Sequence, residues 1–227
     1  MAGRKIFDKK YFTDYYFAMT GEFTKNDFIR NYNWFYGWFE VINSFFPIKN
    51  GSGKKALEIG CSIGSASHVL SEYGYDVTAT DISSYAVKHA KKLLPHIECE
   101  VLDVMEKPKK KHVGSYDLLF AFEVIEHLDK PLNALRNMHS MLAKDGKVIL
   151  STPYPYSYVY YDETHVSVLY PGQWAQLLKQ AGFTKIGFRQ FGFIPYFYRF
   201  SKHLHIPLPF GVNSRYINSP VFLYATK

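Results

Sequence analysis

The chain has 227 residues, of which 47% are hydrophobic and 21% are charged, and this composition excludes a disordered tail or a mini-protein. Two cysteines, Cys61 and Cys99, are too few for a disulfide framework. No run of about eighteen apolar residues predicts a membrane-spanning helix, and no apolar segment follows the basic N-terminal residues as in a secretory leader. We therefore expect a cytoplasmic protein.

The net charge of +7 is unevenly distributed along the chain. Seven basic and no acidic residues follow Glu163, whereas the part up to and including Glu163 holds equal numbers of both. The basic part is also rich in aromatic residues. This mixture suits a phosphorylated ligand, a nucleic acid or an anionic membrane surface. A solvated face over an aromatic core is the alternative interpretation.

Aromatic residues at helical spacing predict one or two N-terminal helices packed on the main domain: Tyr15, Tyr16, Phe17, Phe23, Trp34, Phe35, Trp38 and Phe39. Apolar runs then alternate with amphipathic segments, which indicates βαβ units and a parallel sheet. Caps, prolines and glycines delimit helices over residues 65–73, 84–94, 131–143 and 172–181. Strands are expected over residues 55–59, 75–80, 97–102, 116–122, 147–151, 184–191 and 221–226, with a turn at Asp145 and Gly146.

Residues 192–220 are too many for a plain hairpin and predict an insertion with structure of its own. A helix between Pro195 and Pro207 would place basic and apolar residues on different faces. Its basic face would hold Arg199, Lys202 and His203, and its apolar face Phe197, Phe200 and Leu204.

A strand end, a glycine turn and a helix start follow one another after Leu57. Gly60 and Gly64 allow close approach of a ligand, and a helix N-terminus offers unpaired N–H groups. A dinucleotide fingerprint fails here because Ser62 and Ser65 stand where it requires glycine. The acidic Glu58 would repel a pyrophosphate and attract an ammonium group.

This spacing, Glu58-x-Gly60-x-x-x-Gly64, resembles the first motif of the class I S-adenosylmethionine-dependent methyltransferases. In that family the acid belongs to the network around the methionine amino group, and the glycine loop wraps the cofactor. Ser62 replaces a frequent glycine. The resemblance implies S-adenosylmethionine as cofactor and S-adenosylhomocysteine as product.

The same resemblance assigns roles at the ends of the next strands. Asp81 would bind the ribose hydroxyls, Ile82 would pack on the adenine, and Asp103 would meet the adenine amino group beside Val104. The expected cofactor-binding residues are therefore Glu58, Gly60, Cys61, Ser62, Gly64, Asp81, Ile82, Asp103, Val104 and Glu123.

The segment from Glu123 to Leu128 resembles the EV-x-EH-[LV] segment of small-molecule methyltransferases of the type 11 and type 12 kind, which include quinone and sugar enzymes. Ser151-Thr152-Pro153 fits them as well. The stretch with Asp162 and His165 resembles one at the rim of their acceptor pocket. The resemblance covers roughly residues 54–191.

The family resemblance implies a single domain over residues 1–227. This domain would hold a Rossmann-like, seven-stranded, mostly parallel sheet flanked by helices, with an antiparallel last strand. Residues 1–50 would form a helical cap, 54–191 the cofactor-binding core, 192–220 a lid and 221–227 the last strand. A monomer or a homodimer is expected.

The expected reaction is methyl transfer to a hydroxyl, or to an amine, of a small molecule such as a sugar, a nucleotide-linked sugar, a quinone or a lipid-linked intermediate. His165 and His127 are the candidate general bases. Tyr161, Asp162, Arg199 and Lys202 are the candidate acceptor-binding residues. An acceptor that carries phosphate or rests at a membrane would explain the basic C-terminal third.

Other functions are weaker alternatives. The Asn/Asp-Pro-Pro-aromatic motif of nucleic-acid amino methyltransferases is absent after the fourth strand, so no nucleic-acid partner is expected. No metal is expected, because His203-x-His205 lacks helical ligand spacing and a third ligand. An RNA or protein methyltransferase, and a catalytically silent cofactor-binding module, stay open.

Overall fold

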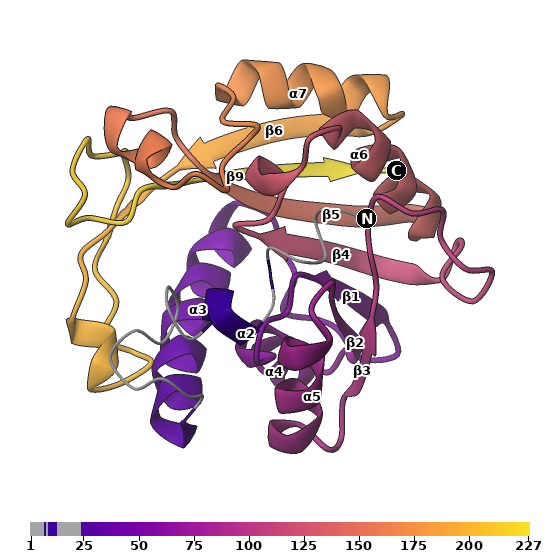
Figure 1. The fold of residues 1–227 in the computed structure, drawn as a ribbon, viewed down its shortest axis with the longest axis horizontal. Helices are drawn as coiled ribbons and strands as arrows, with labels where there is room; N and C mark the ends of the chain where they lie inside the picture. Colours follow the sequence, from indigo (N-terminus) through magenta and orange to yellow (C-terminus); the bar gives the residue numbers. More distant parts are fainter. Residues whose placement is uncertain (1–6, 8, 13–23) are drawn as a thin grey trace.

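The computed structural model describes residue 7, residues 9–12 and residues 24–227. Its centre is a seven-stranded sheet of order β3-β2-β1-β4-β5-β9-β6 (Figure 1). Adjacent strands from β3 to β5 run parallel, and β9 is antiparallel to both β5 and β6. The strands are β1 (Lys55–Ile59), β2 (Asp76–Asp81), β3 (Glu98–Val101), β4 (Tyr116–Phe122), β5 (Leu142–Pro153), β6 (Thr184–Gln190) and β9 (Pro220–Thr226).

Helices cover both faces of the sheet (Figure 1). One face packs against α3 (Lys25–Phe45), α4 (Ser65–Glu72) and α5 (Ser84–Leu93), and the other against α6 (Pro131–Met141) and α7 (Pro171–Gln180). The short helices are α2 (Lys9–Tyr11), η2 (Ile125–His127), η3 (Ser157–Tyr161) and η4 (Phe197–Arg199). The predicted fold class, including the antiparallel last strand, is confirmed.

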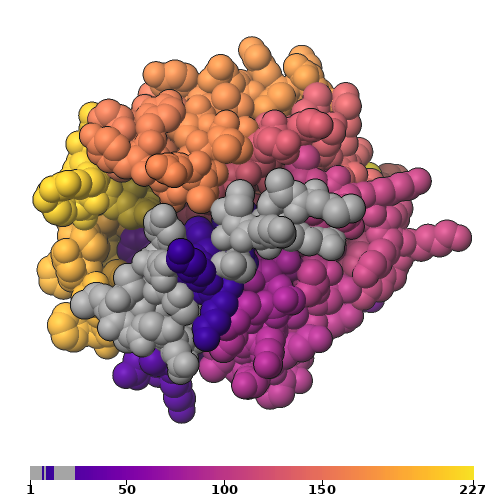
Figure 2. Space-filling model, in the orientation of Figure 1, coloured from indigo at the N-terminus to yellow at the C-terminus, as the bar shows by residue number. Residues whose placement is uncertain are grey.

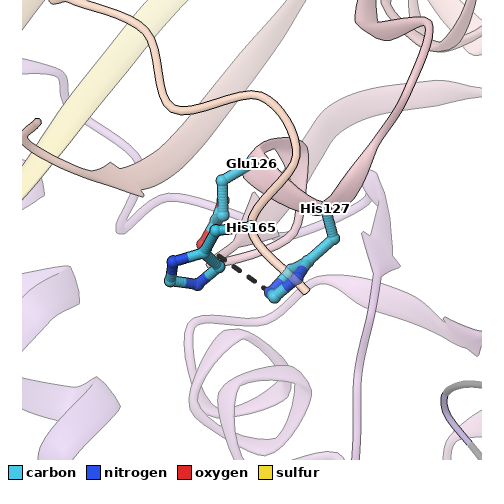
Figure 3. Close-up of side chains that lie close together, drawn as sticks. All are labelled: Glu126, His127 and His165. Atoms are coloured by element: carbon cyan, nitrogen blue, oxygen red, sulfur yellow. Dashed lines mark ion pairs between the residues drawn. The ribbon is translucent and has the colours of Figure 1, made fainter. Parts of the chain in front are cut away.

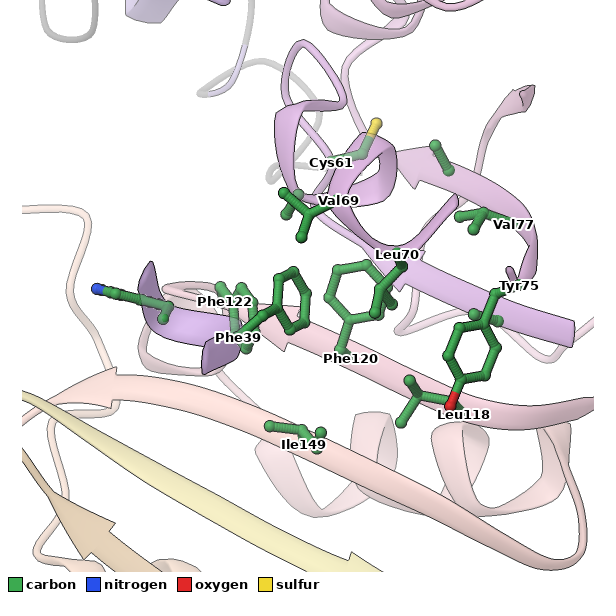
Figure 4. Close-up of a cluster of buried hydrophobic side chains, with 14 of the residues drawn as sticks. Phe39, Cys61, Val69, Leu70, Tyr75, Val77, Leu118, Phe120, Phe122 and Ile149 are labelled. Atoms are coloured by element: carbon green, nitrogen blue, oxygen red, sulfur yellow. The ribbon is translucent and has the colours of Figure 1, made fainter. Parts of the chain in front are cut away.

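Strand β4 shows why the sheet is buried on both faces. Its side chains alternate between the two sides, as in any strand. Leu118, Phe120 and Phe122 join the cluster beneath α3 and α4, which Figure 4 shows, whereas Leu119 and Ala121 join the cluster beneath α6 and α7. Near-continuous apolar strands of this kind are typical of parallel sheets covered on both sides.

Helix α3 is the predicted N-terminal helix, and its start is well defined. Thr24 and Asp27 form a capping box, in which Asp27 N–H donates to Thr24 Oγ1 over 3.2 Å and Thr24 N–H to Asp27 Oδ2 over 2.9 Å. Trp38 and Phe39 are buried in the core. The other predicted aromatic positions, Tyr15, Tyr16, Phe17 and Phe23, lie outside the described residues.

Two local predictions were wrong. Asp145 and Gly146 do not form a turn before the fifth strand; they lie within β5, where Asp145 has φ 60° and the pairing with β4 shifts its register. The Asp-Gly pair is a turn signal in the sequence, and the sequence alone does not distinguish a turn from such an irregularity within a strand.

The helix expected between Pro195 and Pro207 is also absent from the described chain, where only η4 is helical. Tyr196, immediately before η4, has φ 85°, which a helix does not accommodate. The insertion instead folds back on itself, because β7 (Gly192–Phe193) pairs with β8 (Pro207–Leu208) and Ile194 N–H donates to Ile206 O over 3.2 Å.

No helix among the described residues is long and apolar enough to cross a membrane. Cys61 and Cys99 are both buried and unpaired, as small core residues.

Candidate active site

The glycine loop after β1 requires its two glycines. Gly60 and Gly64 have φ values of 78° and 82°, a region that other residues rarely adopt. A Cβ atom on Gly60 would lie 2.4 Å from Cγ2 of Val124. The loop is closed by a 2.7 Å hydrogen bond from Gly64 N–H to Cys61 O, and Cys61 N–H donates to Thr80 O over 2.8 Å. Its backbone is therefore held against β2.

Asp81, at the end of β2, organises the neighbouring loops. Its Oδ2 accepts from Ser62 N–H over 2.9 Å, and its Oδ1 accepts from Ser83 N–H over 2.8 Å. Burial raises the pKa of Asp81 to about 6, although these backbone hydrogen bonds oppose the rise. Each oxygen keeps a further lone pair that could accept from a ribose hydroxyl.

Glu58, within β1, is buried beneath the start of α4. Its Oε2 accepts from Ser67 N–H over 3.0 Å and from the Ser67 hydroxyl. Burial raises the pKa of Glu58 to about 8, with a smaller contribution from Asp81. An ammonium group nearby would stabilise the charged carboxylate, which is the role that the family resemblance implies.

The third acidic position, Asp103, follows β3. Its Oδ1 accepts from Met105 N–H over 2.9 Å, so the side chain shapes the loop. Val104 is buried, and its carbonyl accepts from Asn137 of α6 over 2.8 Å. Ile82 is half-buried beside Asp81. The structure thus places the predicted residues along one edge of the sheet, at the carboxyl ends of β1, β2 and β3.

A small cavity of about 20 Å³ lies against the glycine loop. Its walls include Glu58 and Gly60 from the loop side, Phe122 from the end of β4, and Asn31 and Phe35 from α3. The hydroxyl of Ser62, also in this wall, is buried and makes no hydrogen bond within the described chain. A left-handed glycine, a buried acid and an unpaired hydroxyl fit the polar methionine end of S-adenosylmethionine.

Glu123 stands directly after β4 with φ 53°. Its N–H donates to Ser151 Oγ over 2.9 Å, and the Ser151 hydroxyl donates to Glu123 Oε1 over 2.7 Å. Burial raises the pKa of Glu123 to about 7, while the Ser151 hydrogen bond opposes the rise. The two strand ends β4 and β5 therefore hold this carboxyl in one orientation.

A larger cavity of about 340 Å³ lies next to Glu123. Aromatic side chains from α3, from the segment after β5 and from the insertion line it, together with one guanidinium group. The lining includes Trp34, Glu123, Tyr154, Tyr158, Tyr198 and Arg215. Its size is typical of small-molecule sites, and its wall combines aromatic rings with the polar groups of Glu123, Arg215, Asn218 and Ser219.

His127 and His165 lie together beside Glu126 (Figure 3), with ring centroids 4.8 Å apart. His165 Nδ1 is 2.9 Å from Val159 O, and His127 Nδ1 is 3.1 Å from Thr164 O. A carbonyl oxygen can only accept, so both Nδ1 atoms carry the hydrogen and both Nε2 atoms present a lone pair.

The charge states of this cluster follow from burial. Burial lowers the pKa of His127 to about 4, helped by His165. Burial, with the nearby Glu123, holds the pKa of Glu126 well above its usual value. Glu126 makes no hydrogen bond of ordinary geometry through its carboxyl oxygens to the described residues. One proton-accepting atom from each of Glu126, His127 and His165 lies within 4.8 Å of the others, a donor set that a divalent metal could use.

Asp162 supports the loop that carries His165. Its Oδ1 accepts from the backbone and hydroxyl of Thr164 over 2.9 and 2.6 Å, and its Oδ2 lies 3.7 Å from His165 Nε2. Partial burial raises the pKa of Asp162, but the Thr164 hydrogen bonds outweigh it and the pKa is lowered. Tyr161, the adjacent candidate, is 83% exposed.

The two basic candidates from the insertion are not among the residues that line the larger cavity. Arg199 lies over the Tyr196 ring, 5.0 Å from its centroid. Lys202 donates to the Tyr32 hydroxyl over 2.7 Å and lies 3.6 Å from Glu72. The cavity contains Arg215 instead, which sequence reasoning counted among the basic residues but did not select.

A family model described as a methyltransferase domain matches residues 30–186. A ubiquinone biosynthesis O-methyltransferase of Actinobacillus pleuropneumoniae serotype 7 (strain AP76) is 27% identical over 51% of this chain and 58% of its own length. Phosphoethanolamine N-methyltransferase 3 of Arabidopsis thaliana is 29% identical over 59% of this chain and 29% of its own. The chain thus spans less than two thirds of these curated relatives.

Among solved structures, a SAM-dependent methyltransferase from Archaeoglobus fulgidus superposes with a TM-score of 0.66 at 17% identity, covering 94% of this chain and all of the other. That likeness concerns the fold. Together, the sheet order, the acidic strand ends and the glycine loop define the S-adenosylmethionine-dependent methyltransferase class. The chain belongs to the methyltransferase domain family of that class.

Proposed function

We propose that the protein transfers the methyl group of S-adenosylmethionine to a hydroxyl, or to an amine, of a small molecule bound in the larger cavity. One observation carries this proposal. Phe122 and Glu123 are consecutive residues, yet the first lines the cavity at the glycine loop and the second lines the large aromatic cavity. A methyl donor whose methionine end reaches the first cavity and an acceptor in the second would meet at the end of β4.

Bound S-adenosylmethionine supplies an already activated methyl group, so the protein has few chemical tasks. Its residues must align the acceptor atom with the methyl and exclude water. The aromatic wall formed by Trp34, Tyr154, Tyr158 and Tyr198 suits a flat or sugar-like acceptor. A sugar, a nucleotide-linked sugar, a quinone or a lipid-linked intermediate meets that description, and Arg215 suits an acceptor with an anionic group.

A hydroxyl acceptor also needs a base. His165 and His127 both present Nε2 lone pairs, and Asp162 Oδ2 lies 3.7 Å from His165 Nε2. Neither histidine is among the residues that line the larger cavity, so the base would act on an acceptor that extends from the cavity towards the loop after β5. His165, on that loop, is the preferred base. We assign His127 the second place because its low pKa makes it a weaker proton acceptor.

The test has two steps. Titrated S-adenosylhomocysteine should raise the melting temperature, and absence of a shift in the wild type would remove the cofactor assignment. Incubation with methyl-labelled cofactor and fractionated metabolite extract should then label one small molecule. Label found in RNA or protein alone would favour those acceptors, and cofactor binding without any labelled product would favour a silent binding module.

A further inference from the structure

The insertion between β6 and β9 exposes a group of large apolar side chains. Their exposed fractions range from 46% for Phe197 to 82% for Phe200, and the group consists of Tyr196, Phe197, Phe200, Leu204, Phe210 and Tyr216. Single exposed apolar residues are ordinary, but a concentration of them on one surface segment marks an interaction site. We call these six residues, together with Arg199 and Arg215, the insertion surface.

The two arginines of the insertion surface repeat one arrangement. The guanidinium of Arg199 lies 5.0 Å from the centroid of the Tyr196 ring, and that of Arg215 lies 5.0 Å from the centroid of the Tyr216 ring. Neither arginine forms an ion pair with a residue that the structure describes. Each guanidinium therefore combines an aromatic neighbour with a charge that an external anion can reach.

Charge on the insertion is of one sign. No acidic residue follows Glu163 in the sequence. Glu72 of α4 lies 3.6 Å from Lys202, which is not part of the insertion surface, and Glu123 lines the same cavity as Arg215. A surface of exposed aromatics and unneutralised arginines is complementary to one that is apolar beneath and negatively charged above.

The insertion surface also borders the larger cavity. Tyr198, Arg215 and Tyr216 line that cavity, and Tyr216 and Arg215 belong to the insertion surface. In Figure 2 the last part of the chain, in amber to yellow, lies at the left of the molecule, and the orange part before it runs across the top. Whatever contacts the insertion surface therefore lies beside the mouth of the cavity.

We propose that the insertion surface docks onto an anionic lipid bilayer. Phe200 and Leu204 enter the boundary between headgroups and acyl chains, Tyr196 and Tyr216 lie at headgroup level, and Arg199 and Arg215 contact lipid phosphates. Under the proposed function, this orientation would deliver a membrane-borne acceptor to the cavity, but docking itself requires no methyl transfer.

Sedimentation with lipid vesicles tests the docking. The full chain is mixed with vesicles of phosphatidylcholine alone, or of phosphatidylcholine with phosphatidylglycerol, at low and high salt. We expect binding to the anionic vesicles, much less binding to the neutral ones, and release by salt. Phe200→Glu and Arg199→Glu should each weaken binding about tenfold, consistent with loss of about 1.4 kcal/mol.

Matched controls lie outside the insertion. Val113→Glu replaces another exposed apolar residue, 52% exposed, and Lys110→Glu reverses a charge in the basic run before β4. Both should leave vesicle binding unchanged. The thermal shift with S-adenosylhomocysteine should persist in all four variants, which separates docking from folding and from the cofactor assignment.

Three results would overturn the proposal: no binding of the wild type to anionic vesicles, equal binding to both kinds of vesicle, or equal losses in the control and insertion variants. Salt-sensitive binding to RNA without binding to vesicles would count against it as well. Vesicle binding with no detectable methyl transfer would leave the docking in place and contradict only the proposed function.

Discussion

The Ser62 N–H donates to the Oδ2 atom of Asp81 over 2.9 Å, a hydrogen bond that joins the glycine loop to the end of β2. The sequence motif treats these two residues as separate contacts to one cofactor. In the structure they support each other, because the acid that is expected to bind ribose also holds the loop that is expected to bind the methionine part. Loss of the acid should therefore disturb both halves of the cofactor site.

Asp81→Ala should abolish the thermal shift with S-adenosylhomocysteine. It should also lower the free energy of unfolding by about 1.5–3 kcal/mol, because two backbone N–H groups lose a charged acceptor. Calorimetry with and without ligand measures both effects. Asp76→Ala, at the exposed start of β2, is the control and should keep the full thermal shift; an equal loss there would mean that the effect is not specific to the site.

Glu58→Gln should change how stability depends on pH. The folded-state pKa of about 8 lies above the usual 4.5, so the native state holds a proton that the unfolded chain releases. The contribution of Glu58 is therefore full below pH 4.5 and is lost as pH rises to 8. The free energy of unfolding of the variant should rise by about 1–3 kcal/mol relative to that of the wild type across this window. The upper bound is ~5 kcal/mol, because a difference of one pKa unit corresponds to about 1.36 kcal/mol. Denaturant unfolding at several pH values measures it; a constant difference would contradict the buried-acid interpretation.

His165→Ala should lower kcat by about 10²–10⁴-fold with a hydroxyl acceptor, while the affinity for S-adenosylhomocysteine stays unchanged. A base works in its deprotonated form, so activity should rise with pH through the pKa of whichever histidine acts. An acidic limb near pH 4 would transfer the role to His127, whose pKa is about 4. The pH profiles of wild type, His165→Ala and His127→Ala, measured with a single acceptor, decide the matter.

Arg215→Ala should raise the KM for the acceptor by about ten- to a hundredfold if the acceptor carries an anionic group, since a charged hydrogen bond is worth about 1.5–3 kcal/mol. Lys202→Ala is the matched control, because this lysine is engaged by Tyr32 and Glu72 and is not among the lining residues. Steady-state kinetics with the labelled acceptor provides the comparison. A larger effect at Lys202 than at Arg215 would restore the original sequence-based assignment.

Treatment with a chelator should leave the activity unchanged, since methyl transfer from a sulfonium needs no metal. The three clustered donors, Glu126, His127 and His165, make this a meaningful test. Activity that is lost on chelation and restored by a divalent ion, but not in Glu126→Gln, would show that these side chains hold a metal.

Much of the fold could be predicted because local signals agree with the tertiary structure. Leu57, Glu58 and Gly60 combine a buried strand with a turn that only glycine adopts easily, so β1 and its loop are clear in the sequence. Strand β4 begins and ends where its apolar run does. Errors arose where tertiary pairing decides the conformation, as at Asp145 within β5 and in the segment around Tyr196.

The site could be predicted only in part, for a related reason. Acids at strand ends are detectable because parallel strands bring their carboxyl ends to one edge. The walls of the larger cavity come from α3, from the loop after β5 and from the insertion, and no sequence period links Trp34, Tyr154 and Arg215. Arg199 and Lys202 were favoured because a helix would have aligned them, and the insertion folds otherwise.

Helix α3 contributes Phe35 to the cavity at the glycine loop and Trp34 to the larger cavity. Because Trp34 and Phe35 are adjacent on one rigid helix, a ligand that moves one of them also moves the other. If a ligand in one cavity shifts this helix, it changes the affinity of the other cavity, and thermodynamic reciprocity requires the same factor in both directions. Isothermal titration of each ligand in the presence and absence of the other would measure that factor, and a short side chain at position 34 should bring it towards one.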